Sequence, residues 1–440
     1  DVARRRLSSS SSSSAATDPS ETTRGMITYG VERWRRGARD DARGVLEHAD
    51  VMIAKIGSGV DDGAARDCAS RASTVWASLI RSRGDATSAR EATTKAMTFA
   101  TSAEDVTSAR AMEALTMSRE CAKGKPWEVI ERALGDEAKA LSDASRAAAL
   151  AGARALAALT RFRVDDAFAS AERCAESVID RAALEEAKSA PHGWAVATAL
   201  KTLGHVERLR AADDDAYARA LEYYTRALEY ATDVSINESP GAMASKVIAE
   251  EIIVDCRLAL AQLLISAEDV TLAETHAARA VSGAEALGDE KHPCVGVAVA
   301  VSGDVYVAKA LRSTSGASVL GDGAGVMFAE GLYRNAIKLM HYPHMVEDAE
   351  IVLDYEARHL CALLHARYSS VLRASGEQRR SESDAWLASA KLLWPDERER
   401  DEGGVNGLDV VTSAATKLGT KNGINVLIDL QQMTPLTVGR

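Results

Sequence analysis

The feature that most constrains this chain is a pattern of small and aromatic residues that repeats across pairs of neighbouring helical segments. In the first copy the pattern consists of Leu203, Gly204, Ala220, Tyr224 and Ala227. Residues three and four positions apart lie on one face of a helix, and a glycine lets two helices approach closely. The pattern therefore predicts two antiparallel helices that pack through small residues, with a tyrosine filling the gap between pairs.

Two further copies follow at similar spacing, and each again begins in one segment and ends in the next. The second copy consists of Leu260, Ala261, Ala273 and Ala280, with Ala277 in place of the tyrosine. The third copy consists of Gly303, Tyr306, Ala329, Tyr333 and Ala336, with an insertion between its two segments. Repetition of one two-helix unit is the sequence signature of a solenoid.

The rest of the chain keeps the same helical spacing from residue 31 onward. Glycine and proline interrupt it at intervals of about 12–25 residues, a suitable length for paired helices, and we find no strand-like alternation with hairpin turns. The sequence predicts an all-α fold, a superhelix of antiparallel helix pairs. We divide it into a disordered Ser/Arg-rich targeting segment (1–30), degenerate helical pairs (31–190), the clear repeats (191–400), and a capping helix with a tail (401–440).

These residues resemble the tetratricopeptide repeat family. His292-Pro293 at the start of the third copy is similar to kinesin-light-chain repeats, which often begin a first helix with His-Pro. The stretches 292–297 and 330–339 also resemble a mitochondrial tetratricopeptide protein of plants and green algae, the short-and-swollen-root type. This resemblance implies a scaffold that supports respiration and iron–sulfur or iron handling.

The first residues have the composition of an organelle transit peptide. Arg4, Arg5 and Arg6 precede a serine run from Ser8 to Ser14, and few acidic residues come before Asp18. We predict import into the mitochondrial matrix, with a chloroplast or cytoplasmic location as the alternatives. A plain disordered serine tail would have the same composition.

Composition and motifs argue against several classes of function. A net charge of −11 disfavours nucleic acid as a partner. The six cysteines form no close pairs, so we expect buried thiols, and no apolar run is long enough to predict a transmembrane segment. Nucleophile and zinc-hydrolase motifs are missing, and Glu250-Glu251 is expected on a solvated helix face. We therefore expect no enzyme activity and no catalytic, cofactor or metal-binding residue.

Two further features were weighed as binding sites. His341, His344, His359, Cys361 and His365 lie close in sequence, but their spacing divides them between a loop and different helix faces. The glycine-rich insertion from Ser313 to Gly325 follows no strand and has no Lys-Ser/Thr ending, so a flexible loop is expected rather than a nucleotide site.

A solenoid of helix pairs usually binds its partners along a concave groove that the first helix of each pair lines. The positions that would face this groove are Lys201, His205, Arg208, Gln262, Ile265, Asp304 and Val307. Ile265 and Val307 could equally be packing between units. The set lacks the Lys, Asn and Arg combination of a carboxylate clamp, so we expect no recognition of the acidic tails of Hsp70 or Hsp90.

The sequence thus predicts a non-catalytic scaffold or adaptor that holds a protein or peptide partner in its groove, as a mitochondrial assembly or maintenance factor for respiratory or iron–sulfur machinery. A peptide-reading co-chaperone or targeting receptor is one alternative. A structural subunit of a large complex is another.

Overall fold

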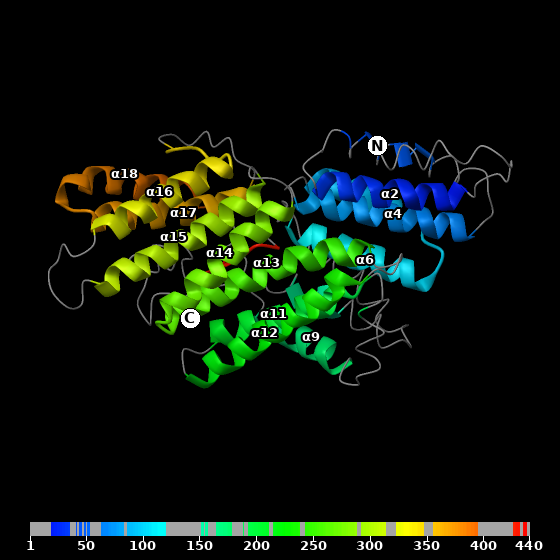
Figure 1. Cartoon of the computed structure of the whole chain (residues 1–440), viewed down its shortest axis with the longest axis horizontal. Helices are drawn as coiled ribbons and strands as arrows, with labels where there is room; N and C mark the ends of the chain where they lie inside the picture. Colours follow the sequence, from blue (N-terminus) through cyan, green and yellow to red (C-terminus); the bar gives the residue numbers. More distant parts are fainter. Residues whose placement is uncertain are drawn as a thin grey trace.

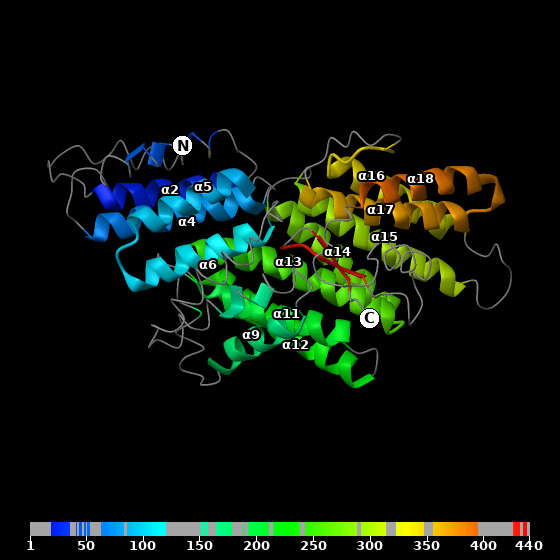
Figure 2. The same cartoon turned by 180° about the vertical axis from the view of Figure 1, so that it is seen from behind.

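The computed structural model gives an all-α protein whose helices pack mainly against their neighbours in sequence (Figures 1 and 2). It describes residues 19–35, 63–82, 86–119, 164–177, 192–210, 214–237, 243–287, 292–313, 323–346, 355–394, 426–431 and 434–437, together with isolated positions between 41 and 52, between 151 and 156, and at 188.

The helices of the first half are α2 (Pro19–Arg35), α4 (Gly63–Ser82), α5 (Ala86–Phe99), α6 (Ala103–Arg119), α9 (Val164–Ser177), α11 (Trp194–Arg210) and α12 (Asp214–Ile236). Those of the second half are α13 (Met243–Ser266), α14 (Val270–Leu287), α15 (Pro293–Ser313), α16 (Gly323–Leu339), α17 (Tyr355–Ala374) and α18 (Arg380–Leu393), with a short 3₁₀ turn at Glu377–Arg379.

The three sequence copies coincide with three consecutive helix pairs. The first copy forms α11 and α12, the second forms α13 and α14, and the third forms α15 and α16, and each helix packs along its partner. Two further pairs, α4 with α5 and α17 with α18, flank them. Figure 1 shows α2 and α4 near one end of the long axis and α16 to α18 near the other.

The glycines of the pattern are positions where two helices meet closely. A β-carbon added to Gly204 would lie 2.5 Å from the ring of Tyr224, and one added to Gly303 would lie 3.0 Å from the ring of Tyr333. Both tyrosines are fully buried. The close helix approach predicted at Gly204 is therefore confirmed, and Gly303 makes the equivalent contact in the third copy.

Two large apolar clusters form the core. One joins α13 to α18 and includes Tyr333 and Trp386, and the other joins α4, α6, α9, α11, α12 and α13 around Trp194. Four described cysteines, Cys174, Cys256, Cys294 and Cys361, are buried as free thiols, as expected. In the described residues one helix, α15, is long and apolar enough to cross a membrane by those two criteria alone, and 72% of its apolar window is buried inside the molecule.

Both ends of the chain depart from the sequence prediction. Residues 19–30, expected to be disordered, belong to helix α2. At the other end, part of the expected tail is a strand: β1 (Val426–Asp429) pairs with β2 (Thr434–Thr437) in an antiparallel hairpin. The capping helix expected at Leu408–Leu418 lies outside the described residues. The run of large apolar residues from Val426 to Ile428 favours a strand, and this preference prevails although the run follows an array of helices.

Candidate functional site: helix side chains that hold an extended strand

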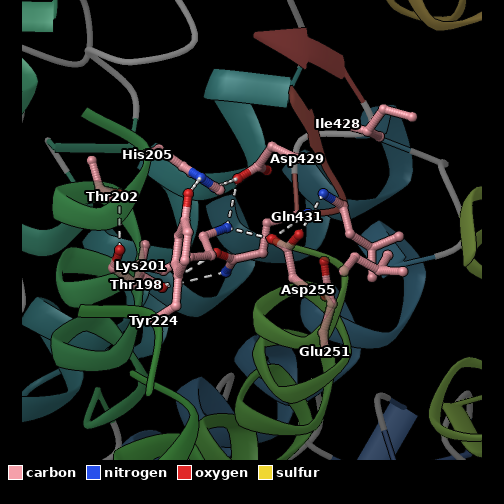
Figure 3. A network of polar contacts seen from close by, with 12 residues as sticks. Thr198, Lys201, Thr202, His205, Tyr224, Glu251, Asp255, Ile428, Asp429 and Gln431 are labelled. Atoms are coloured by element: carbon pink, nitrogen blue, oxygen red, sulfur yellow. Dashed lines mark hydrogen bonds and ion pairs between the residues drawn. The ribbon is translucent and has the colours of Figure 1, made fainter. Parts of the chain in front are cut away.

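β1 and the following turn lie against α11 and α13, the first helices of two adjacent pairs, and β2 packs against α17. The described side chains of β1 and the following turn, from Leu427 to Gln431, are fully buried. The helix residues that bond to them are Arg81 on α4, Thr198, Lys201 and His205 on α11, and Asp255 and Gln262 on α13. Figure 3 labels Thr198, Lys201, His205 and Asp255 among them. We call these six residues the strand-binding face.

Helical spacing places these residues together. Thr198, Lys201 and His205 are three and four positions apart, so they share one face of α11. Asp255 and Gln262 are seven apart, which is close to two full turns of α13. Each helix therefore presents a polar stripe, and the hairpin lies where the two stripes meet.

Much of the binding is directed at the backbone of the strand. The Gln262 amide contacts Ile428 twice: its Nε2 donates to the carbonyl oxygen at 3.3 Å, and its Oε1 accepts from the backbone N–H at 3.0 Å. The Asp255 carboxylate accepts from the N–H groups of Leu430 at 2.9 Å and Gln431 at 3.3 Å. Arg81 donates to the Gln431 carbonyl at 2.8 Å.

These contacts follow from the pairing of the hairpin. Ile428 lies opposite Pro435, and a proline has no N–H to give a neighbouring strand. The N–H and C=O of Ile428 therefore point away from β2 and reach Gln262 instead. The helices thus satisfy the edge of β1 that β2 leaves unpaired, and an unpaired buried backbone group would be costly.

One side chain of the strand is also recognised. The Asp429 carboxylate accepts from Lys201 Nζ at 2.6 Å and from His205 Nε2 at 3.1 Å. Lys201 donates to Asp255 as well, so its ammonium lies between two carboxylates. At the turn, Gln431 exchanges hydrogen bonds of 3.3–3.4 Å with Thr198.

Burial and neighbouring charges set the protonation states of Lys201, His205 and Asp429. Burial alone would lower the pKa of Lys201, but Asp255 and Asp429 raise it above its usual value. Burial lowers the pKa of His205 to about 4 despite the nearby Asp429. Neutral His205 therefore carries its proton on Nε2, facing Asp429, and its Nδ1 accepts from the Tyr224 hydroxyl at 2.7 Å. Burial would raise the pKa of Asp429, but Lys201 and His205 hold it well below its usual range.

A second buried ion pair adjoins the face. Arg81 contacts Glu251 of α13 at 2.5 Å, and both side chains are almost fully buried. Glu251 was expected on a solvated face, and this expectation is wrong. Glu250, its neighbour in sequence, is half-buried, so only one member of the acidic pair is fully enclosed. A buried arginine from α4 makes the difference, because it supplies the charge that an enclosed carboxylate requires.

The predicted groove residues divide into two groups. Lys201, His205 and Gln262 come together on the strand-binding face, but they are buried under the hairpin rather than open to a partner. Arg208 joins them indirectly, because it donates to the Gln262 carbonyl at 3.1 Å.

The remaining three do not reach the strand through any hydrogen bond. Asp304 is buried against Tyr333 and Arg367, each at 2.5 Å. Ile265 is buried in the apolar cluster that joins α13 to α18, and Val307 is partly buried against the same cluster. Both positions agree with the alternative that these residues pack between units.

Sequence reasoning missed three members of the face, Arg81, Thr198 and Asp255, and the two hairpin residues Asp429 and Gln431 that bond to it. Two of these residues could have been identified from the sequence. Asp255 and Asp429 each interrupt a run of large apolar residues, where a carboxylate is rarely found unless it is paired.

His205, Asp255 and Asp429 bring three ligand-type atoms within 4.8 Å of one another. Lys201 already bonds to both carboxylates, so its ammonium takes the place that a cation would occupy. The histidines weighed for metal binding are arranged otherwise. His365 lies 3.1 Å from the Pro343 carbonyl and 3.0 Å from the Ser389 hydroxyl, while His344 and His359 pack edge-on against Trp386 and Trp394.

A scan against protein-family models gives no match, and no curated protein matches the chain in sequence.

Proposed function

We propose that this protein is a non-catalytic scaffold, a tetratricopeptide-like solenoid of helix pairs that binds an extended segment of polypeptide on its strand-binding face. The observation that carries the proposal is the bidentate contact of the Gln262 amide with the backbone of Ile428, next to the contacts of Asp255 with two further N–H groups.

Contacts of this kind do not depend on the side chain of the bound residue. Main-chain hydrogen bonds give affinity for an extended segment, and the alternate side chains add specificity. The face therefore has the chemistry of a peptide-binding surface.

The residues of the face support binding rather than turnover. Neutral His205 uses both ring nitrogens, one toward Tyr224 and one toward Asp429, and the Lys201 ammonium is held by two carboxylates. Each of these polar groups already has partners, either on the strand or on a neighbouring helix. The setting that we propose is the mitochondrial matrix, supported by Arg4 to Arg6 and the serine run, with a role in assembly or maintenance of respiratory or iron–sulfur machinery.

A second candidate function, a peptide-reading co-chaperone or targeting receptor, is favoured by one observation. Lys201 and His205 bind a carboxylate, that of Asp429, although the residues of a full carboxylate clamp are missing from the sequence. An acidic peptide would suit these two positions.

Selection from a displayed library of random 12-residue peptides tests the proposed function. The bait is the full chain with Ile428→Pro, which removes the N–H that Gln262 accepts and so weakens the docking of the hairpin. Far-ultraviolet circular dichroism confirms that the helices remain. We expect enriched peptides whose affinity falls at least tenfold when Gln262→Leu is added. Enrichment of no peptide, or affinities that ignore Gln262, would overturn the proposal.

Location is tested separately. A fluorescent protein fused after residue 60 should enter mitochondria, and a fusion that lacks residues 1–24 should stay in the cytosol. A fusion that is cytosolic in both forms would exclude the matrix.

A further inference from the structure

The strand-binding face keeps its own charges paired without the hairpin. Lys201 is bonded to Asp255, Arg81 is bonded to Glu251, and Tyr224 is bonded to His205, and all six residues belong to helices. Removal of the strand would therefore leave two cations against two carboxylates, with no buried charge lacking its partner.

The hairpin supplies a defined set of groups to the strand-binding face, and Ile428 and Leu430 also join the apolar core of the second half. It contributes backbone groups of Ile428, Leu430 and Gln431, the carboxylate of Asp429 and the side-chain amide of Gln431. An extended segment with an aspartate and a glutamine at the same positions can supply the same groups. Leu427, Ile428 and Leu430 add apolar side chains that are fully buried.

We propose that the C-terminal hairpin is an internal occupant that competes with a segment of a partner protein for the strand-binding face. The inference rests on the proposed function. The partner segment is extended, carries an aspartate between two apolar residues, and has a glutamine two positions after the aspartate, as in Ile428-Asp429-Leu430-Gln431.

Each part of this partner chemistry has a reason in the contacts. An aspartate is favoured because Lys201 and His205 both donate to one carboxylate oxygen, whereas a basic residue would face the Lys201 ammonium. A glutamine is favoured because Thr198 can both donate to and accept from its amide. The apolar neighbours are favoured because the site around them excludes water.

The docked hairpin weakens partner binding by a factor that depends on how often the strand-binding face is open. The apparent dissociation constant of a partner rises by the inverse of the fraction of molecules whose face is open. Partner affinity is thus set jointly by the contacts of the partner and by the stability of the docked hairpin.

Fluorescence anisotropy with a labelled peptide of the sequence 425–437 tests the proposal on the full chain. We expect the peptide to bind the Ile428→Pro protein at least tenfold more tightly than the unsubstituted protein, because the internal competitor is weakened. A peptide that carries Asp429→Asn should bind the Ile428→Pro protein at least tenfold more weakly. Met327→Ala, at a site that is 72% exposed on α16, is the matched control and should leave peptide affinity unchanged.

Equal peptide affinity for the substituted and unsubstituted proteins would overturn the competition. Equal affinity of the Asp and Asn peptides would overturn the carboxylate preference. If Ile428→Pro unfolds, Asp429→Lys replaces it, because it sets an ammonium against Lys201 and leaves the backbone intact. If library peptides bind through Gln262 but the 425–437 peptide binds the substituted and unsubstituted proteins equally, this inference is overturned and the proposed function stands.

Discussion

At the scale of single residues, the glycines at the helix crossings were the most informative positions in the sequence. Gly204 was predicted to allow close helix approach, and both Gly204 and Gly303 lie against the ring of a buried tyrosine. The residue that follows each glycine, His205 or Asp304, bonds to the hydroxyl of the same tyrosine. The repeat therefore encodes a packing contact and a hydrogen bond together, and only the first could be inferred from residue size.

Gly204→Ala tests this contact. The added methyl group would meet the fully buried Tyr224 ring at 2.5 Å, so we expect a loss of about 1–3 kcal/mol in the free energy of unfolding. Gly331→Ala is the control, because nothing lies within 4 Å of that position on α16, and alanine favours a helix by roughly 0.5–1 kcal/mol. Urea denaturation measures both. A stabilised Gly204→Ala protein would contradict the packing described.

Buried histidines give the protein a pH dependence. Burial lowers the pKa of His365 to about 4, despite its hydrogen bond to the Pro343 carbonyl. Between pH 6.5 and about 4 the His365 imidazole therefore binds more protons in the unfolded chain than in the folded one, and its contribution to stability falls as the pH falls. For His365 alone the loss is at most about 3 kcal/mol.

Urea midpoints at a series of pH values test this effect, with His365→Gln as the comparison. The difference in stability between the two proteins should shrink from pH 7 to pH 4, because the variant has no group to protonate there. A difference in stability that stays constant across the pH series would show that His365 is not held neutral.

At the scale of elements, the sequence predicted the helix pairs well and the hairpin not at all. The pairs could be predicted because small residues recur with helical spacing in Ala220, Ala227, Ala329 and Ala336, all of which are fully buried. The hairpin could not, because β1 is only four residues long and its stability comes from side chains on distant helices. Lys201, His205 and Gln262 were correctly placed on one face, but its occupant depended on a contact between segments far apart in sequence.

Gln262→Leu tests how the strand is held. The substitution keeps the size of the side chain and removes both groups that bond to Ile428. We expect the protection of the Ile428 amide in hydrogen–deuterium exchange to fall at least tenfold, while the amides of α13 keep theirs. Thr275→Val, exposed on α14, should change neither. Unchanged exchange at Ile428 would show that the amide contact contributes little to docking.

At the scale of the whole molecule, Arg81 joins three parts of the chain. It lies on α4, pairs with Glu251 of α13 and donates to Gln431 next to the hairpin, 350 positions away in sequence. The N-terminal pairs, the central repeats and the C-terminal strand thus meet at one guanidinium group. No local pattern could have predicted this, because the partners share neither an element nor a repeat.

A double-variant cycle measures this connection. Arg81→Met leaves Glu251 buried without its cation and should lower the free energy of unfolding by about 3–5 kcal/mol. Adding Glu251→Leu removes the orphaned carboxylate, so the double variant should recover part of that loss. Thermal unfolding followed by circular dichroism reports both, and losses that simply add would show that the two side chains act independently.

The large separation in sequence between the helices and the hairpin has a consequence during translation. Gln262 precedes Ile428 by 166 positions, so at 5–20 residues per second the ribosome needs roughly 10–30 s to make the strand after it has made α13. Each newly made molecule therefore passes through an interval in which its polar helix stripes have no strand of their own. Under the competition that we propose, a partner segment that is present in that interval would meet no internal competitor.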